Sequence, residues 1–195
     1  WAAGDCAGTP MFTHASWSDF RIIRAQLSGA SLDDPTTTTK GRTIPYAVFA
    51  TPELARIGLS EGEAREAGLD VRIAKVPTAA IPRAKTMRYA GEGFWKAVVD
   101  ANTHQILGAT LIGPNVSEVI TAVHVAMAGG LAYEQLRFLP IAHPTMGEGL
   151  QAPLSLGVPA WTMELQDPAQ GGCCEDKQGP GTQRVAWASP CTCLL

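Results

Sequence analysis

Two consecutive apolar stretches, residues 94–101 and 106–113, constrain the fold of this 195-residue chain most strongly. In the first, Trp95, Ala97 and Val99 occupy every second position, and this period of two is typical of a strand with one buried face. The second stretch is almost wholly apolar, which is typical of a central strand. The polar residues between them suit a turn, so the pair predicts an antiparallel hairpin.

Further strands are expected at residues 44–50 and 71–76, with an irregular segment at 79–92. Short helices are expected at residues 60–67 and 133–138. The first of these has good local signals, because Ser60 and Glu63 have the spacing of a capping box and Gly68 can end the helix.

The clearest helix is expected between Asn115, as its N-cap, and Gly129, as its stop. Its apolar side chains recur every three or four residues, so they share one face that should be buried. These side chains are Val116, Val119, Ile120, Val123 and Met127. Together with the strands, this helix predicts an α+β fold, in which helices flank an antiparallel sheet.

The chain divides into four parts by composition. Residues 1–30 are expected to contain a strand end, a Gly/Asp turn and a helix from about Thr13. Residues 31–43 are interpreted as a linker, because they contain Asp-Asp-Pro and a run of threonines. Residues 44–151 form the predicted domain. Residues 152–195 are rich in proline and glycine without a sustained period, so we expect a tail of low order.

Charge and cysteine content exclude several classes of protein. The net charge is −3 and there is no basic stripe, which argues against a nucleic-acid partner. No run of apolar residues is long enough for a membrane span. Cysteines are absent between Ala7 and Gly172, so no disulfide framework is expected and the cytoplasm is the predicted setting. The start at Trp1 suggests that an N-terminal part of a longer protein is missing.

One short motif, residues 143–148, joins a histidine to a carboxylate. Pro144 restricts His143 to extended backbone, and a helix is expected to begin near Thr145. Glu148 lies three residues after Thr145, which is the capping-box spacing. Glu148 can also fix the tautomer of His143, as in general acid–base catalysis. Spacing alone leaves both interpretations open: a capped helix beside a loop histidine, or a catalytic pair.

Several segments resemble one family when they are taken in order. Ala2-Ala3-Gly4-Asp5 resembles the second flavin-binding motif of the FAD-dependent pyridine nucleotide–disulfide oxidoreductases. Residues 143–148, His-Pro-Thr-Met-Gly-Glu, resemble the C-terminal His-Pro-Thr-x-x-Glu motif of the same family. Residues 46–61 and the hairpin at 94–113 look like parts of its dimerisation domain. The resemblance covers about residues 1–151 and is greatest to the mercuric reductase and dihydrolipoamide dehydrogenase branch.

The resemblance implies a role for each matching residue. Gly4 and Asp5 would bind FAD, with the Asp5 carboxylate on the ribityl chain, and Thr13 would present a helix N-terminus to the flavin. His143 would be the acid–base residue that serves a redox-active cysteine pair, and Glu148 would orient it. The family further implies NAD(P)H as electron donor, a homodimer, and a small-molecule disulfide or a metal ion as substrate. No resident metal site is expected.

The chain also departs from the family pattern. It lacks the Gly-rich phosphate loop, the nicotinamide-binding domain and the Cys-x-x-x-x-Cys pair, so we expect the isolated chain to be inactive and to bind FAD weakly or not at all. Two alternatives remain open. In the first, the chain is a non-catalytic homodimerisation module. In the second, the vicinal pair Cys173-Cys174 makes a thiol metal-binding tail.

Overall fold

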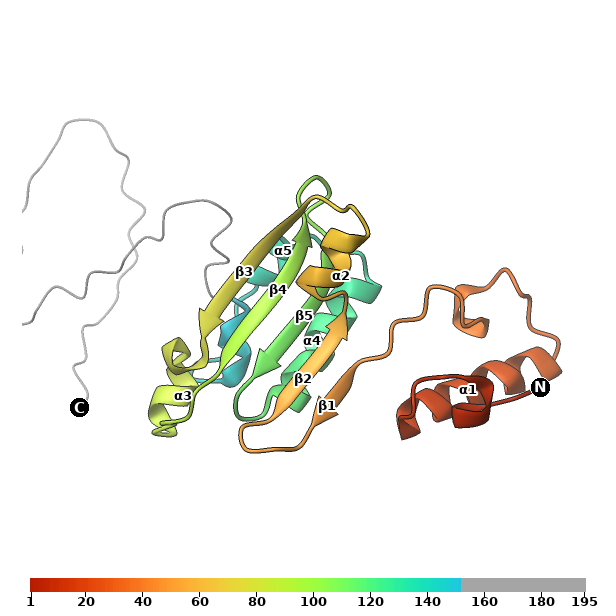
Figure 1. Ribbon diagram of the computed structural model, residues 1–195, viewed down its shortest axis with the longest axis horizontal. Coiled ribbons are helices and arrows are strands. Elements are labelled where there is room, and N and C mark those ends of the chain that lie inside the picture. Colours follow the sequence, from red (N-terminus) through yellow and green to blue (C-terminus); the bar gives the residue numbers. More distant parts are fainter. Residues whose placement is uncertain (152–195) are drawn as a thin grey trace, which may run out of the picture. The chain divides into compact units, whose positions relative to one another are not determined.

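A computed structural model describes residues 1–151 of the chain, and its main domain is a five-stranded antiparallel sheet with helices (Figure 1). The strand order across the sheet is β1-β2-β5-β4-β3. The strands are β1 (Tyr46–Val48), β2 (Leu54–Gly58), β3 (Val71–Pro77), β4 (Phe94–Asp100) and β5 (Ile106–Ile112). This α+β architecture confirms the expected fold class.

The longest helix of this domain is α4 (Val116–Ala128). The other helices are short: α2 (Glu61–Glu66), α3 (Pro82–Thr86) and α5 (Tyr133–Arg137), with the 3-10 helices η3 (Thr78–Ala80) and η4 (Met146–Leu150). The N-terminal segment contains η1 (Gly4–Ala7), α1 (Thr13–Leu27) and η2 (Pro35–Thr37). Within the part of the chain that is described, no helix combines the length and apolarity needed to cross a bilayer.

The hairpin β4–β5 confirms the strongest expectation from the sequence. Trp95 pairs with Leu111 and Ala97 with Ala109, so their side chains lie on one face of the sheet. The register shifts between Val98 and Val99, where a bulge interrupts the ladder. Because β2 pairs with the other edge of β5, this apolar strand is central in the sheet, as its composition predicts.

The core lies between the sheet and α4, which packs on β2 and β5. Side chains of the sheet face and of the α4 stripe are buried together: Ala55, Ile57, Trp95, Ala109, Leu111, Val116, Ile120 and Val123. Val119 and Met127 complete the predicted stripe and are partly buried against this core. The helical spacing therefore identified the buried face correctly.

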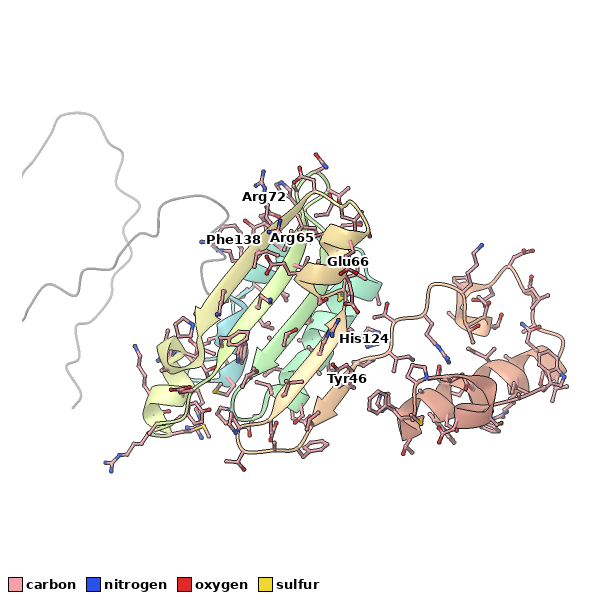
Figure 2. The ribbon with its side chains drawn as sticks, in the orientation of Figure 1. Tyr46, Arg65, Glu66, Arg72, His124 and Phe138 are labelled. Atoms are coloured by element: carbon pink, nitrogen blue, oxygen red, sulfur yellow. The ribbon has the colours of Figure 1, made fainter. Side chains whose placement is uncertain are left out.

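The opposite face of the sheet carries charged residues in register. Arg56 pairs with Thr110, which pairs with Lys96, so their side chains share this face. Helix α2 supplies the counter-charges, with Glu63 bonded to Arg56 and Glu61 lying 3.4 Å from the Lys96 ammonium. Figure 2 shows Arg65 and Glu66 of α2 at the same end of the domain as Arg72 of β3.

The N-terminus of α4 differs from the expectation. Asn115 has a left-handed backbone (φ 58°) and its side chain makes no capping hydrogen bond. The Glu53 carboxylate caps the helix instead, accepting hydrogen bonds from the Ser117 N–H (3.2 Å) and the Ser117 hydroxyl (2.8 Å). A carboxylate is favoured at this positive end of a helix, and here it comes from the loop before β2.

Three further expectations need correction or addition. Strand β2 had no assignment from the sequence, and the segment expected to be irregular contains η3 and α3. No strand ends at Asp5, because residues 1–3 pair with no other strand among the described residues. The Cys6 side chain is exposed. The expected low order of residues 152–195 falls outside the residues described.

Candidate functional site

His143 and Glu148 form a direct hydrogen-bonded pair. The distance between His143 Nδ1 and Glu148 Oε1 is 2.8 Å, and the second carboxylate oxygen, Oε2, accepts the Thr145 N–H at 2.7 Å. Glu148 therefore orients the imidazole and accepts the N-terminal N–H of η4 at the same time, so both contacts that its spacing allows are formed. Catalysis by the pair stays a prediction. The expected helix is present as the 3-10 helix η4, Met146–Leu150, with Thr145 at its N-cap position.

The two side chains have very different exposure. The His143 side chain is 71% exposed, whereas that of Glu148 is 12% exposed. The hydrogen bonds from His143 and the Thr145 N–H lower the pKa of the Glu148 carboxyl, so it is ionised at neutral pH. An ionised carboxylate only accepts hydrogen bonds, which means that Nδ1 of His143 carries the proton. The other nitrogen, Nε2, makes no contact with Glu148 and belongs to a side chain that is mostly exposed.

Packing against β4 fixes this motif in place. Met146 is buried, and Gly149 lies directly on Trp95. A Cβ on Gly149 would come within 2.3 Å of the Trp95 ring, so only glycine permits this close approach. The peptide bond between His143 and Pro144 is cis. The backbone that carries the pair is thus anchored on the core, while the His143 side chain is mostly exposed.

The preceding segment presents apolar side chains to solvent. Phe138, labelled in Figure 2, is 74% exposed and Leu139 is also exposed. The Leu139 carbonyl accepts a hydrogen bond from the Gln151 side chain, which ties the segment to the end of η4. Two exposed apolar side chains, Phe138 and Leu139, therefore precede His143 closely in the chain.

The candidate cofactor residues lie in the N-terminal segment. Gly4 is buried with φ 70°, and a Cβ there would meet the Ser16 hydroxyl at 2.9 Å. Asp5 follows it in η1 and is exposed. Thr13 is exposed at the first position of α1. An exposed carboxylate can accept hydrogen bonds from the hydroxyl groups of a cofactor. An open helix N-terminus can attract an anionic group of the same cofactor.

Sequence reasoning missed one feature of this segment. Asp19 of α1 is buried and bonds to the Gly4 backbone, Thr9 and Arg42. Its position in the α1 pattern gave no sign of burial, because its partners lie between 10 and 23 residues away. The vicinal pair Cys173-Cys174 lies outside the residues described.

Comparison with known proteins identifies the family. The family described as "Pyridine nucleotide-disulphide oxidoreductase, dimerisation domain" matches residues 44–153. The chain belongs to this family. Its five-stranded antiparallel sheet with helices agrees with this assignment, and the solved structures below share the fold.

Individual relatives agree with this assignment. A probable pyridine nucleotide-disulfide oxidoreductase of Escherichia coli, RclA, is 41% identical over 156 residues, which are 80% of this chain and 34% of that protein. A dihydrolipoyl dehydrogenase of Pseudomonas aeruginosa is 34% identical over 151 residues, 77% of this chain and 31% of that protein. These relatives support the dihydrolipoyl dehydrogenase side of the expected branch, and they do not test the mercuric reductase side.

Solved structures give the same result. The structure described as HOCl-induced flavoprotein disulfide reductase RclA from Escherichia coli matches with a TM-score of 0.71, covering 80% of this chain and 35% of that one. LpdA from Mycobacterium tuberculosis is 23% identical with a TM-score of 0.69, which supports the fold alone. The chain therefore spans about a third of the length of the relatives that it matches.

Proposed function

We propose that residues 1–151 are the C-terminal dimerisation and acid–base part of an FAD-dependent, NAD(P)H-linked disulfide or metal-ion oxidoreductase. The observation that carries the proposal is the 2.8 Å pair of His143 and Glu148 in a domain of this family. Because the chain covers about a third of the length of its relatives, the activity belongs to a full-length polypeptide that carries these residues. The isolated chain is expected to be inactive.

In this proposal His143 moves a proton at Nε2. The Glu148 carboxylate holds the Nδ1 proton, so Nε2 can accept a proton from a substrate thiol and return it later. The anchoring of η4 on Trp95 keeps the imidazole in one orientation, which lowers the entropy lost on reaching the reactive arrangement. The cysteine pair that His143 would serve is outside this chain.

Gly4, Asp5 and Thr13 are the proposed FAD contacts. Gly4 allows the cofactor to approach the backbone closely, Asp5 offers a carboxylate acceptor to hydroxyl groups, and the α1 terminus beginning at Thr13 favours developing negative charge. FAD would supply the two-electron redox chemistry when it is bound. Trp17 and Phe20 of α1 are exposed, which fits the proposal that residues 1–30 belong to a larger FAD-binding domain.

The remaining parts of the proposal concern organisation. Residues 31–43 are the linker and residues 44–151 the dimerisation domain, in line with the family match. A homodimer would cover the exposed His143 loop and the apolar Phe138, in an isologous two-fold interface. The proposed setting is the reducing cytoplasm, because no cysteine occurs between Ala7 and Gly172.

The test is rapid-reaction kinetics of the full-length enzyme. His143→Ala should slow the thiol–flavin half-reaction by about 10²–10⁴-fold, the usual contribution of a positioned acid–base group, without loss of flavin. Glu148→Gln should slow it less, because the side chain keeps its shape. His104→Ala is the matched control, since it also removes a histidine paired with a glutamate, Glu134, at 2.6 Å.

The alternative, a non-catalytic homodimerisation module, predicts a different pattern. Glu148→Gln would lower the stability of the domain, and His143→Ala would leave the half-reaction as fast as in the His104→Ala control. That result would overturn the catalytic assignment.

A further inference from the structure

Asp19 is a buried carboxylate whose hydrogen-bond partners lie outside both the His143–Glu148 pair and the five-stranded sheet. Its residue is 4% exposed, and its two oxygens accept three hydrogen bonds. Oδ2 accepts the Gly4 N–H and the Thr9 hydroxyl, both at 2.8 Å, and Oδ1 accepts from Arg42 Nη2 at 2.7 Å. One side chain of α1 thus joins the η1 turn and the linker.

The charge of Asp19 is well compensated. Burial by itself raises the pKa of this carboxyl, but the hydrogen bonds from Gly4, Arg42 and Thr9 outweigh burial and bring the pKa below its ordinary value. Asp19 is therefore ionised at neutral pH and acts only as an acceptor. The guanidinium of Arg42 is largely buried as well and also donates to the Ser18 hydroxyl at 2.8 Å, which holds it beside the carboxylate.

The bond to Gly4 is the informative one. A backbone N–H bonded to a charged acceptor restricts the peptide plane, and Gly4 has a left-handed φ of 70° with little space around it. Asp5 follows directly, so the orientation of Gly4 determines where the exposed Asp5 carboxylate points. Burying a charge costs free energy, and one of the three donors that compensate the Asp19 carboxylate is the backbone N–H of this turn.

We propose that Asp19, held by Arg42, is a positioning residue for the cofactor: it fixes the Gly4–Asp5 turn in the orientation in which Asp5 meets the flavin. This inference rests on the proposed role of Gly4 and Asp5 in FAD binding. Asp19 itself does not touch the cofactor. It acts through the Gly4 N–H, and Arg42 acts through Asp19.

The experiment measures the FAD dissociation constant of the full-length enzyme by reconstituting the apoprotein with FAD. Asp19→Asn keeps the shape but loses the charge, and it should weaken FAD binding by about tenfold or more, the loss expected for one charge-assisted hydrogen bond. Arg42→Gln should weaken binding in the same direction. Ser18→Ala is the matched control, because it removes a contact of Arg42 and leaves the Gly4 bond intact.

A second measurement separates positioning from general stability. In the folded, flavin-loaded Asp19→Asn enzyme, the visible spectrum and fluorescence of the bound flavin should change, because its surroundings shift when the turn moves. A purely structural role predicts a lower melting temperature with an unchanged flavin spectrum and FAD affinity, and this result would overturn the inference. If Asp19→Asn fails to fold, Arg42→Gln provides the same two readouts.

Asp5→Ala distinguishes the inference from the proposed function beneath it. If Asp5→Ala leaves FAD affinity unchanged, the proposed cofactor role of the turn is wrong. If Asp5→Ala weakens binding and Asp19→Asn does not, only the positioning role of Asp19 is wrong. Weakening by both variants, with Ser18→Ala unchanged, is the expected result.

Discussion

Replacing Gly149 by alanine should destabilise the domain at the point where the His143 motif meets the core. The added methyl would lie 2.3 Å and 2.5 Å from two carbons of the Trp95 ring and 2.7 Å from Ile81 Cδ1. Both neighbours are buried in the core, so neither can move without displacing other side chains. Overpacking of this kind costs about 1–3 kcal/mol.

One effect opposes this cost. Alanine loses less backbone freedom than glycine on folding, which favours the variant by about 0.5–1 kcal/mol. The net loss in the free energy of unfolding is therefore about 0–2.5 kcal/mol, and about 1–3 kcal/mol relative to a glycine-to-alanine change that has the same backbone gain without the clash. For a chain of this size each kcal/mol corresponds to a fall in melting temperature of about 2–4 °C. Since η4 carries Glu148, the displaced helix should also disturb the His143–Glu148 pair.

Urea unfolding of the 195-residue chain measures this loss as a lower midpoint at an unchanged slope. Gly147→Ala is the matched control, because a Cβ there meets its nearest neighbours, in Ile141 and Thr145, at an ordinary 3.5 Å. Trp95→Leu in the Gly149→Ala background should recover part of the loss by removing the obstructing ring. If Gly149→Ala is as stable as Gly147→Ala, the close packing of η4 on Trp95 is refuted.

Three other predictions concern the core, the acid–base motif and assembly. Val123→Ala should cost about 1–3 kcal/mol through lost burial and an incompletely closed cavity, measured by the same urea unfolding, and a loss below about 0.5 kcal/mol would count against the buried α4 stripe. The pKa of Glu148 is lowered by His143 and the Thr145 N–H, so its contribution to stability should be complete above the ordinary glutamate pKa of about 4.3 and fall as the pH drops below it. The difference in unfolding free energy between the native chain and Glu148→Gln should therefore shrink from about pH 6 to about pH 3, as measured by thermal melts at several pH values. A difference that stays constant over this range would contradict the pairing. Sedimentation should show a dimer at roughly tens of micromolar, where a standard interface associates, and a monomer at that concentration would speak against the proposed homodimer.

The sequence by itself determined the features that depend on neighbours in the chain. The β4–β5 hairpin follows from a period of two before a short turn and an almost wholly apolar run after it, and the buried face of α4 follows from its apolar spacing. The Ser60–Glu63 capping box formed as its spacing predicts. His143 and Glu148 are five residues apart, so the short 3-10 helix η4 suffices to bring them together. In each case the interacting groups are close enough for local backbone geometry to bring them together.

Only the tertiary structure decided the contacts between distant segments. Glu53 caps α4 across 64 residues, and Asp19 holds Gly4 and Arg42 across 15 and 23 residues. The local sequence gives no reason for glycine at position 149, and the need for it arises only from the contact with Trp95 in the folded domain. Such contacts form because burial of the sheet face brings the elements together, and only then does each polar group or glycine acquire its partner. A local pattern does not specify such a distant partner. The hairpin and the His143–Glu148 hydrogen bond could therefore be predicted from the sequence, and the network around Asp19 could not.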